Sequence, residues 1–145
     1  MSKIIPNLYI GNMQDATNMT NVDFVINCTS NLPFYSPTAR GIRIKFEDNG
    51  NPDEFEKLYD YVKNSNLFHL MDLCLEEKKT ILVHCMGGFQ RSCGLVACYL
   101  IYKLQLNPTQ AIDFIRQKRP VAFFGNVNFL PAIQKYYNSI ACKHQ

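Results

Sequence analysis

Residues 83–92 read Val-His-Cys-Met-Gly-Gly-Phe-Gln-Arg-Ser, so that five residues, two of them glycines, separate a cysteine from an arginine. The apolar run Ile81-Leu82-Val83 leads into this stretch, as in a central strand buried on both faces, and the pattern from Ser92 to Lys103 predicts a helix. A loop between a strand and a helix directs several backbone N–H groups at one point, where the helix N-terminus adds partial positive charge. The stretch therefore predicts a phosphate-binding loop between a buried strand and a helix.

The residue types of this loop suit phosphate chemistry. Gly87 and Gly88 allow unusual backbone conformations and a close approach of an anion. Arg91 can bind two phosphate oxygens through its planar guanidinium, and the same positive field would stabilise a thiolate at Cys85 and make it a nucleophile. A buried cysteine or a glycine turn alone would be structural, but the combination favours chemistry. The chain has no GxxxxGK[ST] motif, which excludes a nucleotide-binding loop as the reason for these glycines.

The composition is that of a globular protein, with 47% hydrophobic and 19% charged residues over a length of 145. We expect one domain over residues 1–145, large enough to bury a core without disulfides. The net charge of +3 is too small to predict a nucleic-acid partner. No apolar run is long enough to span a bilayer, and the first residues lack a secretory signal, so we expect no membrane association and a cytoplasmic or nuclear location.

The six cysteines include no CxxC pair and no cluster with histidine, so the sequence predicts neither a metal site nor a disulfide framework. Most of them are interpreted as small buried apolar residues. Cys93, directly after Ser92, and Cys28, on a strand that could run nearby, are alternative redox partners for Cys85, although an inert buried thiol is the plainer interpretation of each.

The remaining elements are predicted from their patterns and end signals. Strands are expected at residues 23–28, 42–46 and 81–83, and helices at 51–73 (with a break near 64–66), 92–103, 107–119 and about 128–141. Asn51-Pro52 and Asn107-Pro108 are helix-start signals, each an asparagine cap followed by proline. The order of these elements predicts a single-domain α/β fold in which helices cover a central mixed sheet.

Residues 84–92 match the pattern HCxxGxxR[ST], and here the sequence resembles the dual-specificity phosphatases of the cysteine-based protein tyrosine phosphatase superfamily. The resemblance covers nearly the whole chain. Its further segments are residues 5–12, 24–29, 44–48 and 116–120, followed by Asn126 and Phe129-Leu130. It implies a doubly covered central sheet and a two-step phosphoryl transfer that needs no metal or other cofactor.

The resemblance also implies roles for single residues. Cys85 would attack phosphorus to form a phosphocysteine, and Arg91 would stabilise the equatorial oxygens. Asp48 would protonate the departing oxygen and then act as base for water, and Ser92 would ease the departure of the thiolate. The remaining substrate-binding positions are those whose loop amides face the phosphate: Met86, Gly87, Gly88, Phe89 and Gln90.

Two supporting residues follow from the same resemblance: His84 would hold the loop from behind, and Asn126 would brace it. The assignment of the general acid to Asp48 has two alternatives, Glu47 and Asp53, which lie close to it in the sequence. In addition, an aspartate in a turn is usually structural. Gln90 departs from the small residue that the family usually has before the arginine, and we expect its amide to lie near the phosphate. Gly87 stands where alanine is usual.

The expected substrate is a phosphorylated protein, dephosphorylated on tyrosine and on serine or threonine. A non-protein substrate, either a phosphoinositide or an RNA 5′-triphosphate, is an alternative that the uncharged variable positions of the loop disfavour. A phosphopeptide-binding pseudophosphatase is a second alternative, disfavoured because the cysteine and arginine are both present. The sequence leaves the oligomeric state open.

Overall fold

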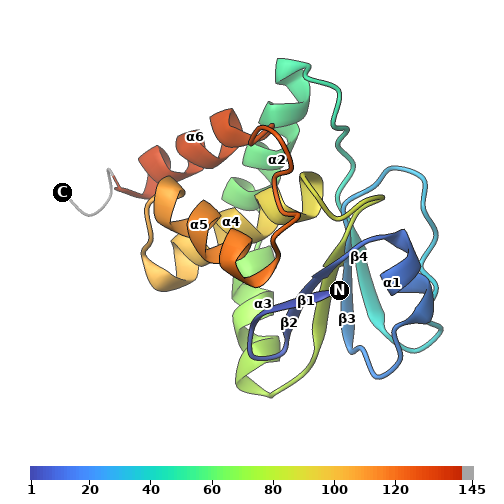
Figure 1. Ribbon diagram of the computed structural model, residues 1–145. Coiled ribbons are helices and arrows are strands. Elements are labelled where there is room, and N and C mark those ends of the chain that lie inside the picture. Colours follow the sequence, from blue (N-terminus) through green and yellow to red (C-terminus); the bar gives the residue numbers. More distant parts are fainter. Residues whose placement is uncertain (142–145) are drawn as a thin grey trace.

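Strand β5 (Ile81–His84) is the central strand of a five-stranded sheet in the computed structural model, which describes residues 1–141 (Figure 1). The strand order is β1-β2-β5-β3-β4, with β1 (Ser2–Ile5) antiparallel to β2 (Leu8–Gly11) and the other neighbours parallel. Strands β3 (Phe24–Asn27) and β4 (Arg40–Arg43) complete the sheet. This mixed sheet confirms the predicted α/β class and places β5 where both of its faces are covered.

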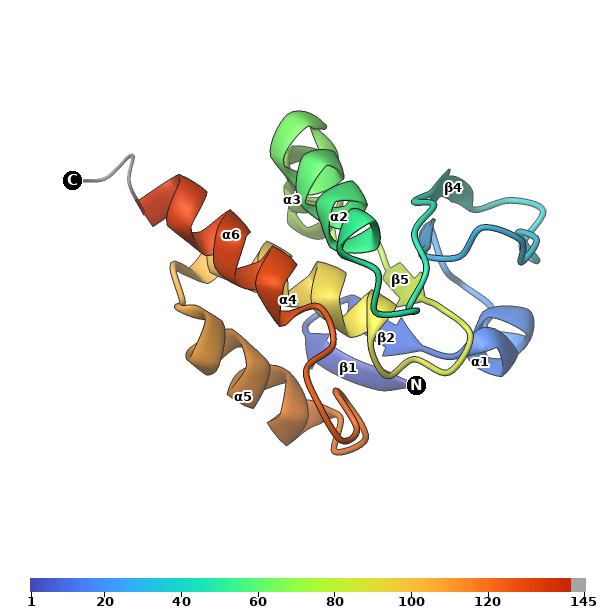
Figure 2. The ribbon, with the colours of Figure 1, turned by 90° about the horizontal axis from the view of Figure 1, so that it is seen from above.

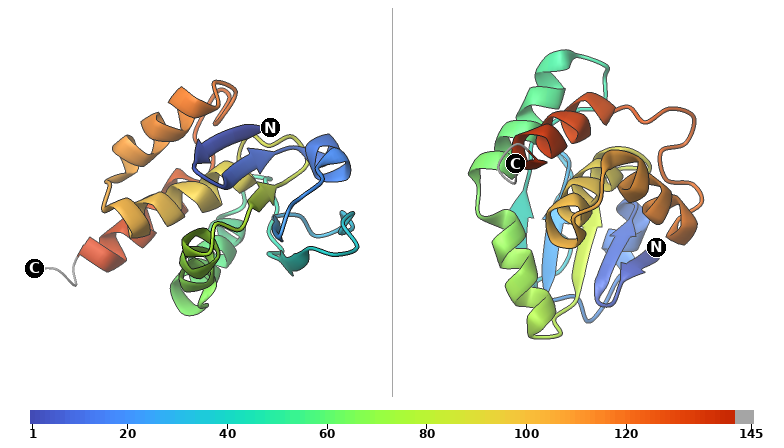
Figure 3. Two further views of the ribbon diagram at one scale, coloured as in Figure 1. Left: turned by 90° about the horizontal axis from the view of Figure 1, so that it is seen from below. Right: turned by 90° about the vertical axis from the view of Figure 1, so that its left-hand side faces the viewer.

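Five helices cover one face of the sheet (Figures 2 and 3). They are α2 (Pro52–Asn64), α3 (Leu67–Glu76), α4 (Arg91–Leu104), α5 (Pro108–Lys118) and α6 (Leu130–Ala141). The side chains of Ile81 and Val83 face the core beneath these helices, whereas Leu82 points the opposite way, as the period of two in a strand requires. The opposite face is covered by the short helix α1 (Met13–Asn18) and by part of the segment between β3 and β4.

The helix starts confirm the signals in the sequence. The side chain of Asn51 accepts a hydrogen bond from the Asp53 amide at the start of α2, and Asn107 forms a reciprocal capping box with Gln110 at the start of α5. The long helical stretch is interrupted after Asn64, so that α2 and α3 are separate helices, as expected. None of the helices within residues 1–141 combines the length and the apolar character that a bilayer crossing requires.

The strand predicted at residues 42–46 is displaced, because pairing with β3 extends only over Arg40–Arg43. The Ile44 amide still donates to the Asn27 carbonyl, but β3 ends there and the chain then leaves the sheet. Ile44 and Phe46 are nevertheless both buried in the core. The alternation of apolar and basic residues that predicted a strand therefore arises because an extended segment outside the sheet packs its apolar side chains into the core.

Candidate active site

The loop between β5 and α4, residues 85–90, turns its carbonyl groups toward the surrounding protein. The Met86 carbonyl accepts from the Met13 amide at 2.9 Å, and the Phe89 carbonyl accepts from the Phe123 amide at 2.7 Å. Within residues 1–141 no hydrogen bond runs from the backbone amides of residues 86–91 to another protein group. The loop therefore has its acceptors satisfied and its donors available, which is the arrangement that binds an anion.

Gly88 is required in this loop for two independent reasons. Its φ of +71° lies in the left-handed region, and a Cβ atom added there would lie 2.7 Å from the Gly11 carbonyl oxygen and 2.5 Å from Nη2 of Arg119. Gly87 has no such restriction, because its φ is ordinary and an added Cβ would meet the ring of Phe89, a side chain rather than backbone. Alanine at position 87 would thus require only a movement of that ring.

Cys85 lies at the carboxyl end of β5, with only 3% of its surface exposed, at the base of the loop. Its Sγ is 3.3 Å from Oγ of Ser92, which is buried in the first turn of α4. Nδ1 of the buried His84 donates to the Cys85 carbonyl at 3.4 Å, since a carbonyl can only accept. Burial lowers the pKa of His84 below its ordinary range, so the imidazole is neutral near pH 7 and suited to holding the loop.

Arg91 begins α4, and its guanidinium is paired with a carboxylate. Nη1 of Arg91 lies 3.4 Å from Oε2 of Glu47, and the other oxygen of Glu47 accepts from Ser30 Oγ at 2.6 Å. The Glu47 amide donates to the buried carboxylate of Glu54, whose pKa is lowered chiefly by its hydrogen bond from Lys57. Glu47 is therefore fixed at three points. The sequence identified it only as a rival for the general acid.

Asp48 lies next to Glu47, but its carboxylate has a different partner. Nδ2 of Asn128 donates to both of its oxygens, at 3.1 and 3.3 Å. The Asn128 amide in turn donates to Oε1 of Gln90, so that Asn128 joins the Asp48 segment to the phosphate-binding loop. Asp53 is in the first turn of α2, as expected of a residue that stabilises a helix start.

Gln90 and Asn126 are placed differently from expectation. The side chain of Gln90 is buried and turned away from the centre of the loop, because its Nε2 donates to the carbonyls of Asn126 and Phe124, at 2.7 and 3.3 Å. Only its backbone can contribute to anion binding. Asn126 is exposed, and in the described part of the chain it contributes its carbonyl to this contact and no side-chain hydrogen bond. Asn126 thus takes part in this contact through its carbonyl, and the same Gln90 side chain also accepts from the Asn128 amide.

Arg119 is a supporting residue for which the sequence gave no functional prediction. It is buried, and its Nε donates to the Gly88 carbonyl at 2.9 Å while Nη1 donates to Ser2 Oγ at 3.0 Å. Arg116, one turn earlier, donates to the carbonyls of Ala122 and Phe123. The two arginines therefore fix the loop and the segment after α5 to each other and to β1. Their spacing before Pro120 is the signal that could have identified them.

Two further thiols lie near Cys85. The Cys28 amide donates to the His84 carbonyl, so Cys28 follows β3 at the register position next to Cys85. Sγ of Cys93 donates to the Gly88 carbonyl at 3.5 Å. Burial raises the pKa of Cys28, and it raises the pKa of Cys93 to about 12. Both side chains are therefore neutral thiols near pH 7, as inert packing residues would be.

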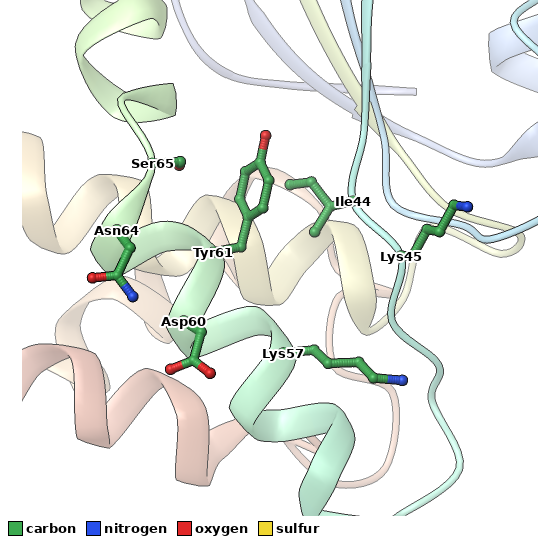
Figure 4. A pocket seen from close by; sticks show the side chains of 7 residues that line it. All are labelled: Ile44, Lys45, Lys57, Asp60, Tyr61, Asn64 and Ser65. Carbon is green, nitrogen blue, oxygen red and sulfur yellow. The ribbon is translucent and has the colours of Figure 1, made fainter.

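Three cavities in the described part of the chain lie away from Cys85. The first, of about 520 Å³, is an open groove between α2 and the segment that contains Ile44 and Lys45 (Figure 4). Two others, of about 240 and 500 Å³, lie beside α3 and α6 and beside α1. None of these three includes a residue of the phosphate-binding loop.

Comparison with known protein families gives one match that spans most of the chain. The family model described as "Dual specificity phosphatase, catalytic domain" matches residues 8–139. Among curated proteins, the chain is 28% identical over 151 residues to tyrosine-protein phosphatase yvh1 of Schizosaccharomyces pombe, covering 100% of this chain and 43% of that protein. It is 26% identical over 147 residues to dual specificity protein phosphatase 8 of Mus musculus, covering 97% and 21%. The chain thus spans less than half the length of these two relatives.

Solved structures show the same fold. Human DUSP28 has a TM-score of 0.83 and 21% identity, covering 99% of each chain. The human tyrosine phosphatase-like serine/threonine/tyrosine-interacting protein has a TM-score of 0.75 and 18% identity, covering 98% of this chain and 97% of that one. At these identities the likeness establishes the architecture, and chemistry has to be argued from the residues of the site.

Proposed function

Because the chain belongs to the dual-specificity phosphatase catalytic-domain family, we propose that it hydrolyses phosphate monoesters of proteins, on tyrosine and on serine or threonine, through a phosphocysteine intermediate. The observation that carries this proposal is the position of the Cys85 thiol. It lies at the base of a loop with available amides, 3.3 Å from the Ser92 hydroxyl and directly before the helix that begins with Arg91.

In the first step the Cys85 thiolate attacks phosphorus, a P–S bond forms, and the bond to the leaving oxygen breaks. The loop amides and Arg91 stabilise the equatorial oxygens, and Asp48 gives its proton to the leaving oxygen. The carboxylate of Glu47 lies against one side of the Arg91 guanidinium, so the phosphoryl group must share or replace this contact.

In the second step a water molecule attacks the phosphocysteine, Asp48 removes a proton from the water, and the P–S bond breaks. The Ser92 hydroxyl is placed to donate a hydrogen bond to the departing thiolate. Asn128 donates to the Asp48 carboxylate, which is the form that acts as a base in this step. His84, being neutral and buried behind the loop, holds the Cys85 carbonyl and transfers no proton.

Two features support a broad protein substrate over a non-protein one. The family model that matches the chain is described as a dual specificity phosphatase, which supports action on phosphoserine and phosphothreonine as well as on phosphotyrosine. The variable loop positions Met86, Gly87 and Phe89 are uncharged, and the Gln90 amide is engaged elsewhere, so the loop supplies no second cation for a polyphosphorylated headgroup or a triphosphate.

The deciding experiment is a phosphate-release assay. The substrates are phosphotyrosine, phosphothreonine and phosphoserine peptides, an inositol phospholipid and a 5′-triphosphorylated RNA, with Cys85→Ser as the inactive control. We expect turnover of all three peptide classes, with Cys85→Ser retaining oxyanion binding. Faster release from the lipid or the RNA would overturn the substrate class. Phosphopeptide binding without turnover by the wild type would favour the pseudophosphatase alternative.

A further inference from the structure

Exposed apolar residues stand in the phosphate-binding loop and in the two segments that are hydrogen-bonded to it. We call four of them the apolar rim: Met13 with 37% of its surface exposed, Met86 with 47%, Phe89 with 43% and Phe124 with 78%. Met86 and Phe89 are variable positions of the loop, and the other two come from segments on either side of it. Large apolar side chains gathered at a candidate active site mark a binding surface more often than side chains scattered singly.

Backbone hydrogen bonds hold these segments beside the loop. The Met13 amide, at the start of α1, donates to the Met86 carbonyl, and the Phe123 amide donates to the Phe89 carbonyl. Nε2 of Gln90 donates to the Phe124 carbonyl itself. In Figure 2 the loop after β5 is accordingly flanked by α1 and by the segment that leads into α6. These hydrogen bonds therefore keep the rim segments next to the loop.

In the turn around Phe124, the backbone is strained at one residue and the next side chain is exposed. Phe123 has a φ of +56°, which is rare for a bulky residue, and Gly125 has a φ of +80°. Phe123 is buried, and Arg116 donates to its carbonyl at 3.0 Å, so the turn is anchored beneath Phe124. A loop that only connected two helices would need neither the strain nor an exposed phenylalanine.

We propose that the apolar rim binds an apolar side chain next to the phosphorylated residue of the protein substrate. This inference rests on the proposed function, because a phosphate bound in the loop fixes where the neighbouring residues lie. An extended peptide advances about 3.3 Å per residue, so the residues flanking the phosphorylated one must cross the surroundings of the loop.

The charges at the site favour a peptide over a membrane as the occupant. Apolar patches that insert into bilayers usually act together with basic residues that bind anionic lipid. Here the exposed charged side chains that adjoin the loop include the carboxylates of Glu47 and Asp48. They would repel an anionic membrane surface spread over the rim, whereas a phosphopeptide places its charged group in the loop, where the amides and Arg91 bind it.

The test compares matched phosphotyrosine peptides that differ only in carrying Leu or Asn on the N-terminal or the C-terminal side of the phosphotyrosine. For the wild type we expect kcat/KM to favour Leu by ~10-fold on at least one side, the size of discrimination that an apolar contact supplies. In Phe124→Ser this ratio should fall to nearly 1, and Phe124→Leu should restore most of it. Leu73→Ser, an exposed leucine on α3 remote from the loop, is the matched control and should keep the wild-type ratio.

Activity on a small aryl phosphate, measured alongside, separates this inference from the proposed function. A wild-type ratio near 1, or a ratio that Phe124→Ser leaves intact, with normal turnover of the aryl phosphate, would overturn the rim proposal alone. If the wild type does not hydrolyse the aryl phosphate, both proposals are overturned. Phe124-dependent activation by phospholipid vesicles without any peptide preference would assign the rim to a membrane and would also overturn this proposal.

Discussion

At the scale of single residues, the adjacent acids Glu47 and Asp48 contact different partners and are expected to have different roles. Glu47 is paired with Arg91 and held by Ser30, whereas Asp48 is held by Asn128. Of the two, only Asp48 lies clear of the arginine that would bind the phosphoryl group. We therefore expect their substitutions to act on different parameters, Asp48 on proton transfer and Glu47 on anion binding.

Asp48→Asn keeps the shape of the side chain and removes its proton. Hydrolysis of phosphothreonine or phosphotyrosine peptides should slow by ~10²–10⁴-fold, the usual range for general acid–base catalysis. Formation of phosphocysteine from an activated aryl phosphate, measured by rapid quench, should change far less, since its leaving oxygen needs no proton. Asp53→Asn, in the first turn of α2, is the control. If the Asp53 variant shows the leaving-group dependence instead, the general acid is Asp53 and the assignment to Asp48 is wrong.

Glu47→Gln removes a negative charge beside the phosphate site. Because Glu47 competes with the anion for Arg91, inorganic phosphate should inhibit the variant competitively at a concentration ~2- to 5-fold lower, the scale of a partly exposed ion pair. The difference should shrink at high ionic strength. Glu56→Gln, which breaks a pair with Lys135 on the far side of α2, should leave the inhibition constant unaltered. Equal or weaker inhibition of Glu47→Gln would contradict the competition.

At the scale of elements, Arg119 links three of them: it follows α5, supports the loop through the Gly88 carbonyl, and reaches β1 through Ser2. Arg119→Met retains the apolar stem but leaves the buried Gly88 carbonyl without this donor. We expect a loss of ~1–3 kcal/mol in the free energy of unfolding, the cost of an unsatisfied buried group. Urea unfolding measures it. Lys118→Met, an exposed neighbour, should change stability by less than about 0.5 kcal/mol, and an equally small effect for Arg119→Met would refute the linking role.

The elements also show where prediction from sequence succeeded and where it could not. Local signals predicted α2 and α5, because a cap such as Asn107 acts within its own turn. The short α1 was missed, although Asn12 and Asp15 form a capping box that the sequence displays. At the site, residues 83–92 predicted the loop. The choice between Asn126 and Asn128, and the direction of the Gln90 amide, depend on a segment 36 to 38 residues away, and no local pattern encodes such contacts.

At the scale of the whole molecule, the buried His84 ties stability to pH. Burial lowers its pKa, and the nearby charge of Arg43 adds to this effect, while the hydrogen bond to Cys85 partly opposes it. The unfolded chain therefore binds a proton at His84 more readily than the folded protein does. Its contribution to stability is complete above the ordinary histidine pKa of about 6.5 and is lost as the pH falls below that value.

The free energy of unfolding should accordingly decrease between pH 7 and pH 5.5, with a contribution from His84 of up to ~1.4 kcal/mol per pH unit. Urea titrations at half-unit steps measure this slope, and NMR of the His84 ring in the folded protein should show a titration midpoint below that of an unburied histidine. A free energy of unfolding that stays level or increases on acidification, with the ring protonating near pH 6.5, would disprove this account.

The burial of the two elements that bracket the loop has a consequence for motion. All four residues of β5 are buried, and so are ten consecutive residues of α4, from Ser92 to Ile101. The opening free energy of such buried segments approaches that of global unfolding. Their amides should therefore exchange hydrogen for deuterium slowest. The exposed residues 48–50 and 124–126, whose amides donate no hydrogen bond to another group of residues 1–141, lack such protection and should exchange fast. Any adjustment to a substrate would then come from these exposed segments, while the strand and the helix on either side of the loop keep their positions.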